Sequence, residues 1–396
     1  MKLSNVAIAV QKSVKVLIAI IVLYYVAILI IIPVATNIYK ATFPQKTLPN
    51  NLYGQIEPMT FASERISNNN PVYKLNTSNG RLPVGFPNQV YIYRERTPQF
   101  SYEAGKIAQA DAAVLGYSDA DLASDLKGST YRWLNKSTQG YLQIQVQNKS
   151  MVSSTPMLAK ASSYTPGVLK ADTAVNMAKN ILTKIDRFTD QTYIDGTYTE
   201  VLGRVTDAGI FQTLAPEEVE VARIDFFRTV GLSSFNNKPY PILGPDAKKG
   251  LLHIVVGNTS TPNITTDRNP FVEAYYKEIE TETKATYPII PVDSAWNEVS
   301  AGKGVFSNIT PKDSNPFVDY QPVRVDNILV NYVYLAYYED PVFHKYLYPI
   351  YVFEGNYTAA DGGEGSITIY YPALAPEAMV QPAQSTASAP KPSLAQ

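Results

Sequence analysis

The stretch VRVDNILVNYVYLAYY, residues 323–338, indicates the fold most directly. It is rich in β-branched and aromatic residues, which favour strands, and successive side chains of a strand point to opposite faces. One predicted face carries Ile328, Val330, Tyr332, Tyr334 and Ala336. The other carries Leu329, Asn331, Val333, Leu335 and Tyr337. Both faces are largely apolar, so we predict a central strand of a sheet, covered on one side by a helix that begins near Asp293.

Tyrosine is the unusual part of the composition, with 29 residues, several of them within and after this strand. Sheet packing explains most of them, because a tyrosine ring can be buried while its hydroxyl reaches water. The alternative is an aromatic surface for a partner protein or a wall glycan, since Tyr is enriched at interfaces. The residues of this possible partner surface are Tyr332, Tyr334, Tyr337 and Tyr351.

Helical and strand patterns alternate along the rest of the chain. Apolar residues recur at helical spacing in residues 102–115 and 172–185, and a short capped helix is predicted at 293–299. The other predicted strands are 89–93, 130–134, 141–146, 219–230, 251–256, 346–353 and 367–371. Each helix precedes strands, so we expect three helix–strand–strand modules.

The predicted fold class is α+β, with one N-terminal transmembrane helix followed by a β-rich region of such modules with antiparallel sheets. The predicted segments are a cytoplasmic N-terminus (1–15), a transmembrane helix (16–35), a Pro-rich β segment (36–98), three α+β modules (99–160, 165–262 and 285–374) and a disordered tail (375–396). The tail is rich in Ala, Pro, Ser and Gln, and it lacks the apolar side chains that would offset the entropy of ordering.

Residues 16–35 form an uncharged apolar run, VLIAIIVLYYVAILIIIPVA. As a helix, the run would be about 30 Å long, the thickness of a bilayer core. Lys2, Lys12 and Lys15 precede it without any acidic residue, which predicts a cytoplasmic N-terminus and an extracytoplasmic C-terminal region. A cleaved signal peptide is the alternative, but its apolar region is usually shorter.

Composition excludes several classes of site. The formal net charge is -1, so no basic footprint for nucleic acid is present. The chain has no cysteine, which excludes disulfides, thiol catalysis, iron–sulfur clusters and thiolate zinc sites. A cysteine-free exterior domain favours a prokaryotic envelope. The potential N-glycosylation sequons include Asn76, Asn135, Asn263, Asn308 and Asn356.

Two family resemblances follow from these patterns. The predicted helix at 102–115, with strands at 130–134 and 141–146, resembles the plan of PepSY-type domains. Further segments are similar to the exterior part of YycH/YycI-type proteins, bacterial single-pass proteins that regulate a wall-sensing histidine kinase. These segments are ARIDFFR (222–228), AWNEVSAG (295–302), LAYY (335–338) and PIYVF (349–353). The resemblance implies a non-enzymatic envelope protein that binds other proteins.

No motif in the sequence identifies a catalytic site. His253 lies in the apolar run 251–256 and is expected to be partly buried and hydrogen-bonded, whereas His344 lies in a predicted loop. Neither has a second histidine at the spacing of a zinc motif. The sequence contains no G-x-S-x-G elbow, no P-loop and no G-x-G-x-x-G fingerprint.

Three sets of acidic residues are expected to have structural roles and not to form catalytic or metal sites. Glu217, Glu218 and Glu220 are expected at a solvated helix end or strand edge. The glycine-rich stretch 361–365 predicts a hairpin turn, with a cation site at Asp361 and Glu364 as the alternative. The set Asp313, Asn315 and Asp319 lacks the Gly and Glu of a calcium loop. We therefore predict no catalytic, cofactor-binding or metal residues.

The predicted function is that of a membrane-anchored extracytoplasmic protein that binds or regulates envelope partners and is not an enzyme. The predicted partners are the membrane and an envelope protein, with no nucleic acid and no nucleotide. One alternative is a structural component of an envelope or secretion assembly. Another is an envelope hydrolase whose site forms only in three dimensions.

Overall fold

The computed structural model describes residues 48–380, apart from residues 69, 98, 100, 124–128, 168, 170, 232–238, 261–264 and 319, together with parts of residues 15–32. The sheets and the helices that pack on them belong to the unit formed by residues 50–396.

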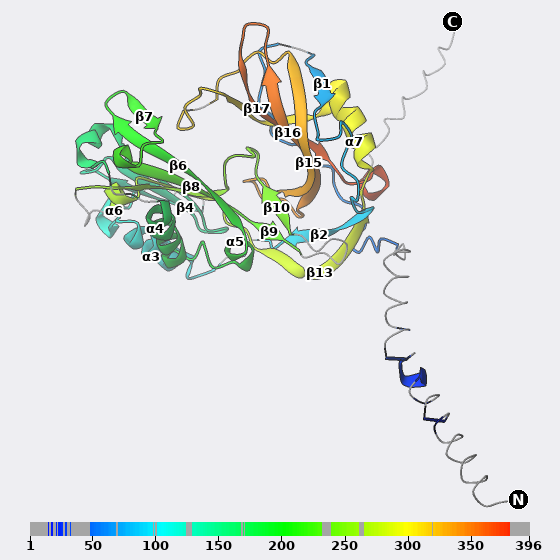
Figure 1. Cartoon of the computed structure of the whole chain (residues 1–396). Helices are drawn as coiled ribbons and strands as arrows, with labels where there is room; N and C mark the ends of the chain where they lie inside the picture. Colours follow the sequence, from blue (N-terminus) through cyan, green and yellow to red (C-terminus); the bar gives the residue numbers. More distant parts are fainter. Residues whose placement is uncertain are drawn as a thin grey trace, which may run out of the picture. The chain divides into compact units, whose positions relative to one another are not determined.

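A seven-stranded sheet is built around β15 (Asn327–Tyr338). Its main strands, in spatial order, are β14 (Val305–Pro311), β17 (Glu364–Pro372), β16 (Tyr348–Thr358), β15, β10 (Tyr240–Leu243) and β9 (Thr229–Val230). β1 (Val72–Leu75) runs parallel to the first part of β15, and β10 runs parallel to its end. β15 therefore has partners on both edges, which confirms the predicted central strand (Figure 1).

A β-bulge in β15 changes which of its side chains share a face. The pairing with β16 shifts between Val330 and Tyr332, which leaves Asn331 as the extra residue. The core on one face contains Ile328, Val330, Val333, Leu335 and Tyr337 of β15. The prediction that Ile328 and Tyr332 share a face is therefore wrong, because strict alternation does not continue across a bulge.

Both faces of β15 are largely covered within the chain. α7 (Val292–Glu298) packs on the face that carries Ile328, as predicted, and the Trp296 ring lies 5.8 Å from the Phe353 ring. The opposite face packs against the segment around Ile56 and against a two-stranded ribbon. The strands of this ribbon are β2 (Gln89–Glu95) and β13 (Ile279–Pro288).

An eight-stranded antiparallel sheet forms the second large element of the fold. Its strands, in spatial order, are β3 (Thr130–Asn135), β4 (Gly140–Gln145), β5 (Ser150–Ser154), β12 (Phe271–Ala274), β11 (Leu252–Gly257), β8 (Val221–Phe227), β6 (Thr197–Thr206) and β7 (Gly209–Gln212). α3 (Ala104–Val114) and α4 (Ala171–Lys184) cover one face of it (Figure 1). The short helices α5 (Gln191–Ile194) and α6 (Thr265–Arg268) precede β6 and β12.

The predicted helix–strand–strand modules are not formed. β5, from the predicted first module, pairs with β12, which lies between the predicted second and third modules. β10, from the second, pairs with β15 of the third. The predicted fold class of PepSY-like modules is therefore wrong, because strands that are distant in sequence combine into two large sheets with few helices.

The predicted transmembrane helix is also corrected. Among the residues that the structure describes, no helix is both long and apolar enough to span a membrane. Only part of the predicted span, residues 16–35, lies among them, and residues 1–14 lie outside them.

The predicted disordered tail includes residues with defined contacts. Met379 forms a β-bridge with Ile56, and the backbone N–H of Val380 donates to the Ile56 carbonyl at 2.9 Å. Ala375 and Ala378 are buried. Residues 381–396 of the predicted tail lie outside the described residues.

Candidate functional site

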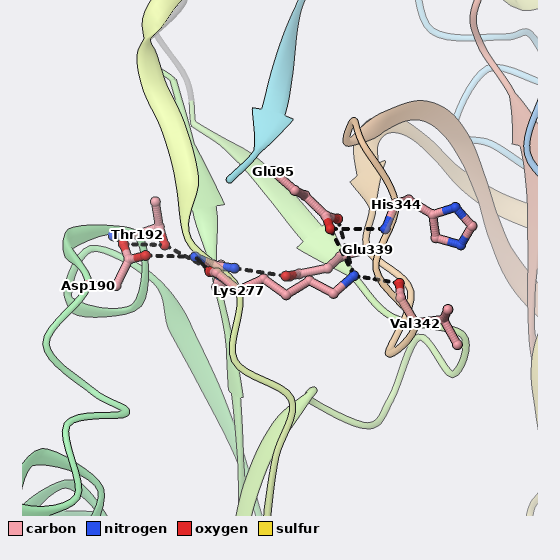
Figure 2. Close-up of polar contacts among 8 residues, drawn as sticks. Glu95, Asp190, Thr192, Lys277, Glu339, Val342 and His344 are labelled. Carbon is pink, nitrogen blue, oxygen red and sulfur yellow. Dashed lines mark hydrogen bonds and ion pairs between the residues drawn. The ribbon is translucent and has the colours of Figure 1, made fainter. Parts of the chain in front are cut away.

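Arg228 lies between β8 and β9, at the point where the chain passes from one sheet to the other. Its guanidinium forms ion pairs with Glu339 at 2.8 Å and Asp190 at 2.7 Å. It also donates to Thr192 Oγ1 and to the Lys277 carbonyl, both at 2.8 Å. These contacts bring together four segments that are distant in the sequence. Figure 2 shows the partners Asp190, Thr192, Lys277 and Glu339.

The buried charge of Arg228 is fully compensated. Burial by itself lowers the pKa of Arg228, but the Glu339 carboxylate, Tyr193 and the Asp190 carboxylate outweigh it and raise the pKa above its ordinary value. Asp190 is affected in the opposite sense: burial raises its pKa, but Arg228 and two hydrogen bonds from Thr192 lower it overall. The guanidinium also lies 4.9 Å from the centre of the Tyr193 ring. The group therefore stays charged and holds the junction in one arrangement.

Lys277 extends this arrangement into a second ion pair (Figure 2). Its ammonium lies 3.0 Å from Glu95 Oε2 and donates to the Val342 carbonyl at 2.6 Å. The backbone N–H of His344 donates to the same carboxylate at 3.2 Å. Burial raises the pKa of Glu95 to about 7, although Lys277 lowers it. Glu95, Asp190, Thr192, Arg228, Lys277 and Glu339 together form the junction network.

A pocket of about 270 Å³ lies beside the junction network, and Lys277 belongs to both. We call it the junction pocket; its lining residues are Arg96, Thr97, Gln99, Gln147, Asn148, Lys149, Tyr276, Lys277, Glu278 and Phe343. Three of these side chains are cationic and one is acidic. Arg96 pairs with Glu278 at 2.5 Å, and the Lys149 ammonium lies 5.6 Å from the centre of the Tyr276 ring. The pocket thus combines positive charge, side-chain amides and two aromatic rings.

A smaller pocket of about 80 Å³, the side pocket, is lined partly by the same residues. Helix α3 and the end of β4 form its apolar wall. The residues of this wall are Ala104, Ile107 and Ala108 of α3, Ile144 of β4, and Val146, which follows β4. Asp111 and Arg187 also line it and form a buried ion pair at 2.9 Å. Its lining is therefore mainly apolar, in contrast to the junction pocket.

The four tyrosines of the predicted partner surface do not form one surface. Tyr332 is 69% exposed, and Tyr334 is half-buried with its hydroxyl donating to Glu354 at 2.8 Å. Tyr337 and Tyr351 are 1% and 0% exposed. Their hydroxyls donate to the backbone carbonyls of Tyr91 and Ile290. Neither buried ring can contact a partner in this structure, because both belong to the core beneath α7.

The two histidines occupy different environments. His253 is buried, as expected; its Nδ1–H donates to the Gly250 carbonyl at 3.0 Å, and its ring stacks on Phe271. Burial lowers the pKa of His253 to about 3, with the Lys249 ammonium acting in the same direction. Its Nε2 lies 3.1 Å from Glu273 Oε2. His344 is half-buried, and burial lowers its pKa.

The acidic groups are placed separately. Glu217 and Glu218 are exposed, whereas Glu220 is buried and accepts from the Val205 N–H at 2.7 Å. Asp361 accepts from the Gly363 N–H within the β16–β17 turn, and Glu364 pairs with Lys312. Asp319 lies outside the described residues. Within the described part of the chain, no group of three or more His, Cys, Asp or Glu residues could hold a metal ion.

The junction network is absent from the sequence-based candidates. Arg228 and Glu339 each stand at the end of an apolar strand run, and a charge in that position is a signal for a buried ion pair. Lys277 and Asp190 lie in polar stretches, where a charged residue carries no such signal. Their contribution depends on chain segments that meet only in the folded protein.

Comparison with known proteins gives little further guidance. No protein-family model matches the sequence, and no curated protein matches it. The crystal structure of an uncharacterized protein from Eubacterium rectale is similar at 13% identity, with 72% of this chain and 85% of that chain covered and a TM-score of 0.41. A similarity of this size carries no argument about function. The resemblance to PepSY-type and YycH/YycI-type proteins stays a prediction.

Proposed function

We propose that the chain is a non-enzymatic binding protein that holds a segment of a partner protein in the junction pocket. The observation that supports this most is the construction of the pocket. Its walls come from the end of β2, the β4–β5 turn, the β12–β13 connection and the loop before β16. Lys277 joins three of these segments through its ion pair with Glu95 and its hydrogen bond to the Val342 carbonyl. Arg187 holds the β4–β5 turn by donating to the Lys149 carbonyl at 2.8 Å. A pocket held in this way is preorganised, which favours binding.

The lining suits a polypeptide. Gln99, Gln147 and Asn148 offer side-chain amides that can both donate to and accept from peptide groups. Tyr276 and Phe343 offer aromatic surface, which is enriched at protein interfaces. The pocket volume of about 270 Å³ lies just below the roughly 300–1,000 Å³ typical of ligand pockets, so a short extended segment fits better than a folded domain.

We further propose that the partner is an envelope protein and that binding takes place outside the cytoplasm. Both parts of this proposal follow from the resemblance to YycH/YycI-type proteins.

A pocket-filling variant tests the binding function. Random twelve-residue peptides are selected against the wild-type protein, and their affinities are then measured for wild type and for Thr97→Trp, which places a large ring in the pocket. We expect the substitution to weaken binding at least about tenfold, or ~1.4 kcal/mol. Fluorescence anisotropy with labelled peptides gives the dissociation constants.

Val84→Trp is the matched control, because Val84 is 97% exposed and does not line the pocket. It should bind the selected peptides as wild type does. The proposal is wrong if no peptide is enriched, or if the enriched peptides bind Thr97→Trp as tightly as wild type.

A further inference from the structure

The junction pocket and the side pocket share a wall. Gln99, Gln147 and Lys149 line both. The junction pocket offers cations and amides, whereas the side pocket offers mainly aliphatic side chains. Arg96 and Lys277 are already paired with Glu278 and Glu95, whereas the partner of Lys149 is exposed, so Lys149 is the cation that a ligand's anion can reach. A ligand that occupies both pockets therefore needs a small apolar group next to a negatively charged one.

The size of the side pocket limits the apolar group. Its volume of about 80 Å³ is roughly half of the ~150 Å³ cavity that admits benzene. An aliphatic side chain fits this space better than an aromatic ring. Two of the charged groups on its wall, Arg187 and Asp111, are already satisfied, since Arg187 donates to Asp111 at 2.9 Å and to the carbonyls of Lys149 and Ile185 at 2.8 and 2.5 Å. They therefore act as a fixed wall.

Lys149 is the cation that lies between the two pockets. Its φ is 57°, a left-handed conformation that glycine adopts more easily than lysine, yet this turn carries a lysine. The ammonium has three donors, and its carboxylate partner Asp186, at 3.1 Å, is largely exposed. Since the exposed pair contributes little by itself, an incoming carboxylate can join or replace Asp186.

We propose that the ligand is an aliphatic carboxylate, supplied by the free carboxyl terminus of a partner polypeptide. Lys149 binds the terminal carboxylate, and the last side chain, of the size of valine or leucine, fills the side pocket. The preceding residues lie in the junction pocket beside Gln147 and Asn148. This inference rests on the proposed function and specifies which end of the partner is recognised.

Two peptide pools test it. Both consist of hexapeptides with five random positions followed by leucine, and one pool ends in a free carboxylate whereas the other ends in an amide. Retention by the folded full-length protein is measured by equilibrium dialysis and mass spectrometry. We expect the acid pool to be retained at least tenfold more than the amide pool, and a third pool ending in glycine to be retained less than the leucine acid pool.

The Lys149→Gly variant identifies the residue responsible. Glycine suits the left-handed position, so the fold and melting temperature should be kept while the preference for the acid pool is lost. Gln139→Gly is the matched control. Gln139 has the same φ of 57°, in the β3–β4 turn, and lines neither pocket. It should keep the full preference for the acid pool.

Each outcome bears on a different part of the proposal. Equal retention of acid and amide pools, or an acid preference that survives Lys149→Gly, overturns the inference and leaves the binding function standing. Failure to retain any pool, together with failure of the twelve-residue selection, overturns both.

N-acetyl-leucine distinguishes the source of the carboxylate. If N-acetyl-leucine binds as tightly as the best hexapeptide acids, the ligand is a free small carboxylate and not the end of a polypeptide, which would overturn this part of the proposal.

Discussion

Glu95 is fully buried beside Lys277, and its carboxyl group titrates at a higher pH than that of an ordinary glutamate. Burial raises the pKa of Glu95 from 4.5 to about 7, although Lys277 opposes this. A carboxyl group whose pKa is higher in the folded than in the unfolded protein contributes stability that is complete below the unfolded pKa. That contribution is lost as the pH rises through the folded pKa. The wild-type protein should therefore lose stability between about pH 4.5 and pH 7.

The Glu95→Gln variant isolates this effect. Over this pH range, the free energy of unfolding of the variant should fall by roughly 1–3 kcal/mol less than that of wild type. Urea unfolding at a series of pH values measures both curves. Glu278→Gln, which alters an exposed carboxylate nearby, serves as the control and should keep the wild-type slope. Parallel curves for wild type and Glu95→Gln would contradict the assignment.

The burial of a single residue can be predicted from sequence where the strand that contains it determines its surroundings. His253 lies in an unbroken apolar run, and the structure buries it with a hydrogen bond, as expected. Tyr337 and Tyr351 lie in the core, which agrees with the sheet packing expected for most tyrosines and not with the alternative of a partner surface. The sequence shows that a strand has two apolar faces, but it does not show what covers each face.

Gly355 is the residue of β16 that faces the bulge of β15. A Cβ atom built there would lie 1.9 Å from the Leu329 carbonyl oxygen, far closer than atoms can approach. Gly355→Ala should therefore lower the free energy of unfolding by about 1–3 kcal/mol, because β15 and β16 must separate locally. Thermal and urea unfolding measure the change.

Gly363→Ala, in the turn between β16 and β17, is the control for this substitution. A Cβ there would have no neighbour closer than 3.2 Å, so the effect should stay within about 0.5 kcal/mol. Equal effects of the two substitutions would show that the bulge does not require glycine.

The helices were more predictable than the strand faces. α3, α4 and α7 lie close to the predicted helices, because helical periodicity is read within one segment. The predicted cap of α7 is not formed, since Pro291 at its N-cap makes no side-chain cap hydrogen bond. The bulge at Asn331 has no comparable local signal. It depends on pairing with a strand further along the chain, so alternation in 323–338 could not reveal it.

Arg228 joins the two sheets through its ion pairs with Glu339 and Asp190. Arg228→Met would leave the buried Glu339 carboxylate without its cation, and such losses typically cost 3–5 kcal/mol. We expect a reduction of about that size in the free energy of unfolding. Replacing Glu339 as well, with Arg228→Met and Glu339→Leu, removes the buried unpaired carboxylate and should restore part of the loss, while the less buried Asp190 still lacks its cation.

Arg324→Met is the control at this scale, because the Arg324–Asp326 pair lies at the surface and should contribute less than about 1 kcal/mol. Urea unfolding followed by circular dichroism measures all four proteins. Equal stability of Arg228→Met and Arg324→Met would contradict the role of Arg228 at the junction.

The arrangement of the sheets was the least predictable part. Strand pairing such as β5 with β12 links residues more than a hundred positions apart, and neither composition nor periodicity specifies such partners. The predicted modules assumed that neighbouring segments pair with one another. For the same reason the junction pocket, whose walls come from four separate segments, was not predicted.

The parallel pairing of β1 with β15 also affects how the protein is made. The side chains of Asn76 and Asn331, next to this pairing, are hydrogen-bonded across 255 residues of chain. At about 5–20 residues per second, a ribosome needs on the order of 10–50 s to complete that interval. During this time β1 has left the ribosome without its partner strand. β1 is only four residues long and follows a proline, Pro71. Both features limit unwanted pairing of β1 with a neighbouring nascent chain during this interval.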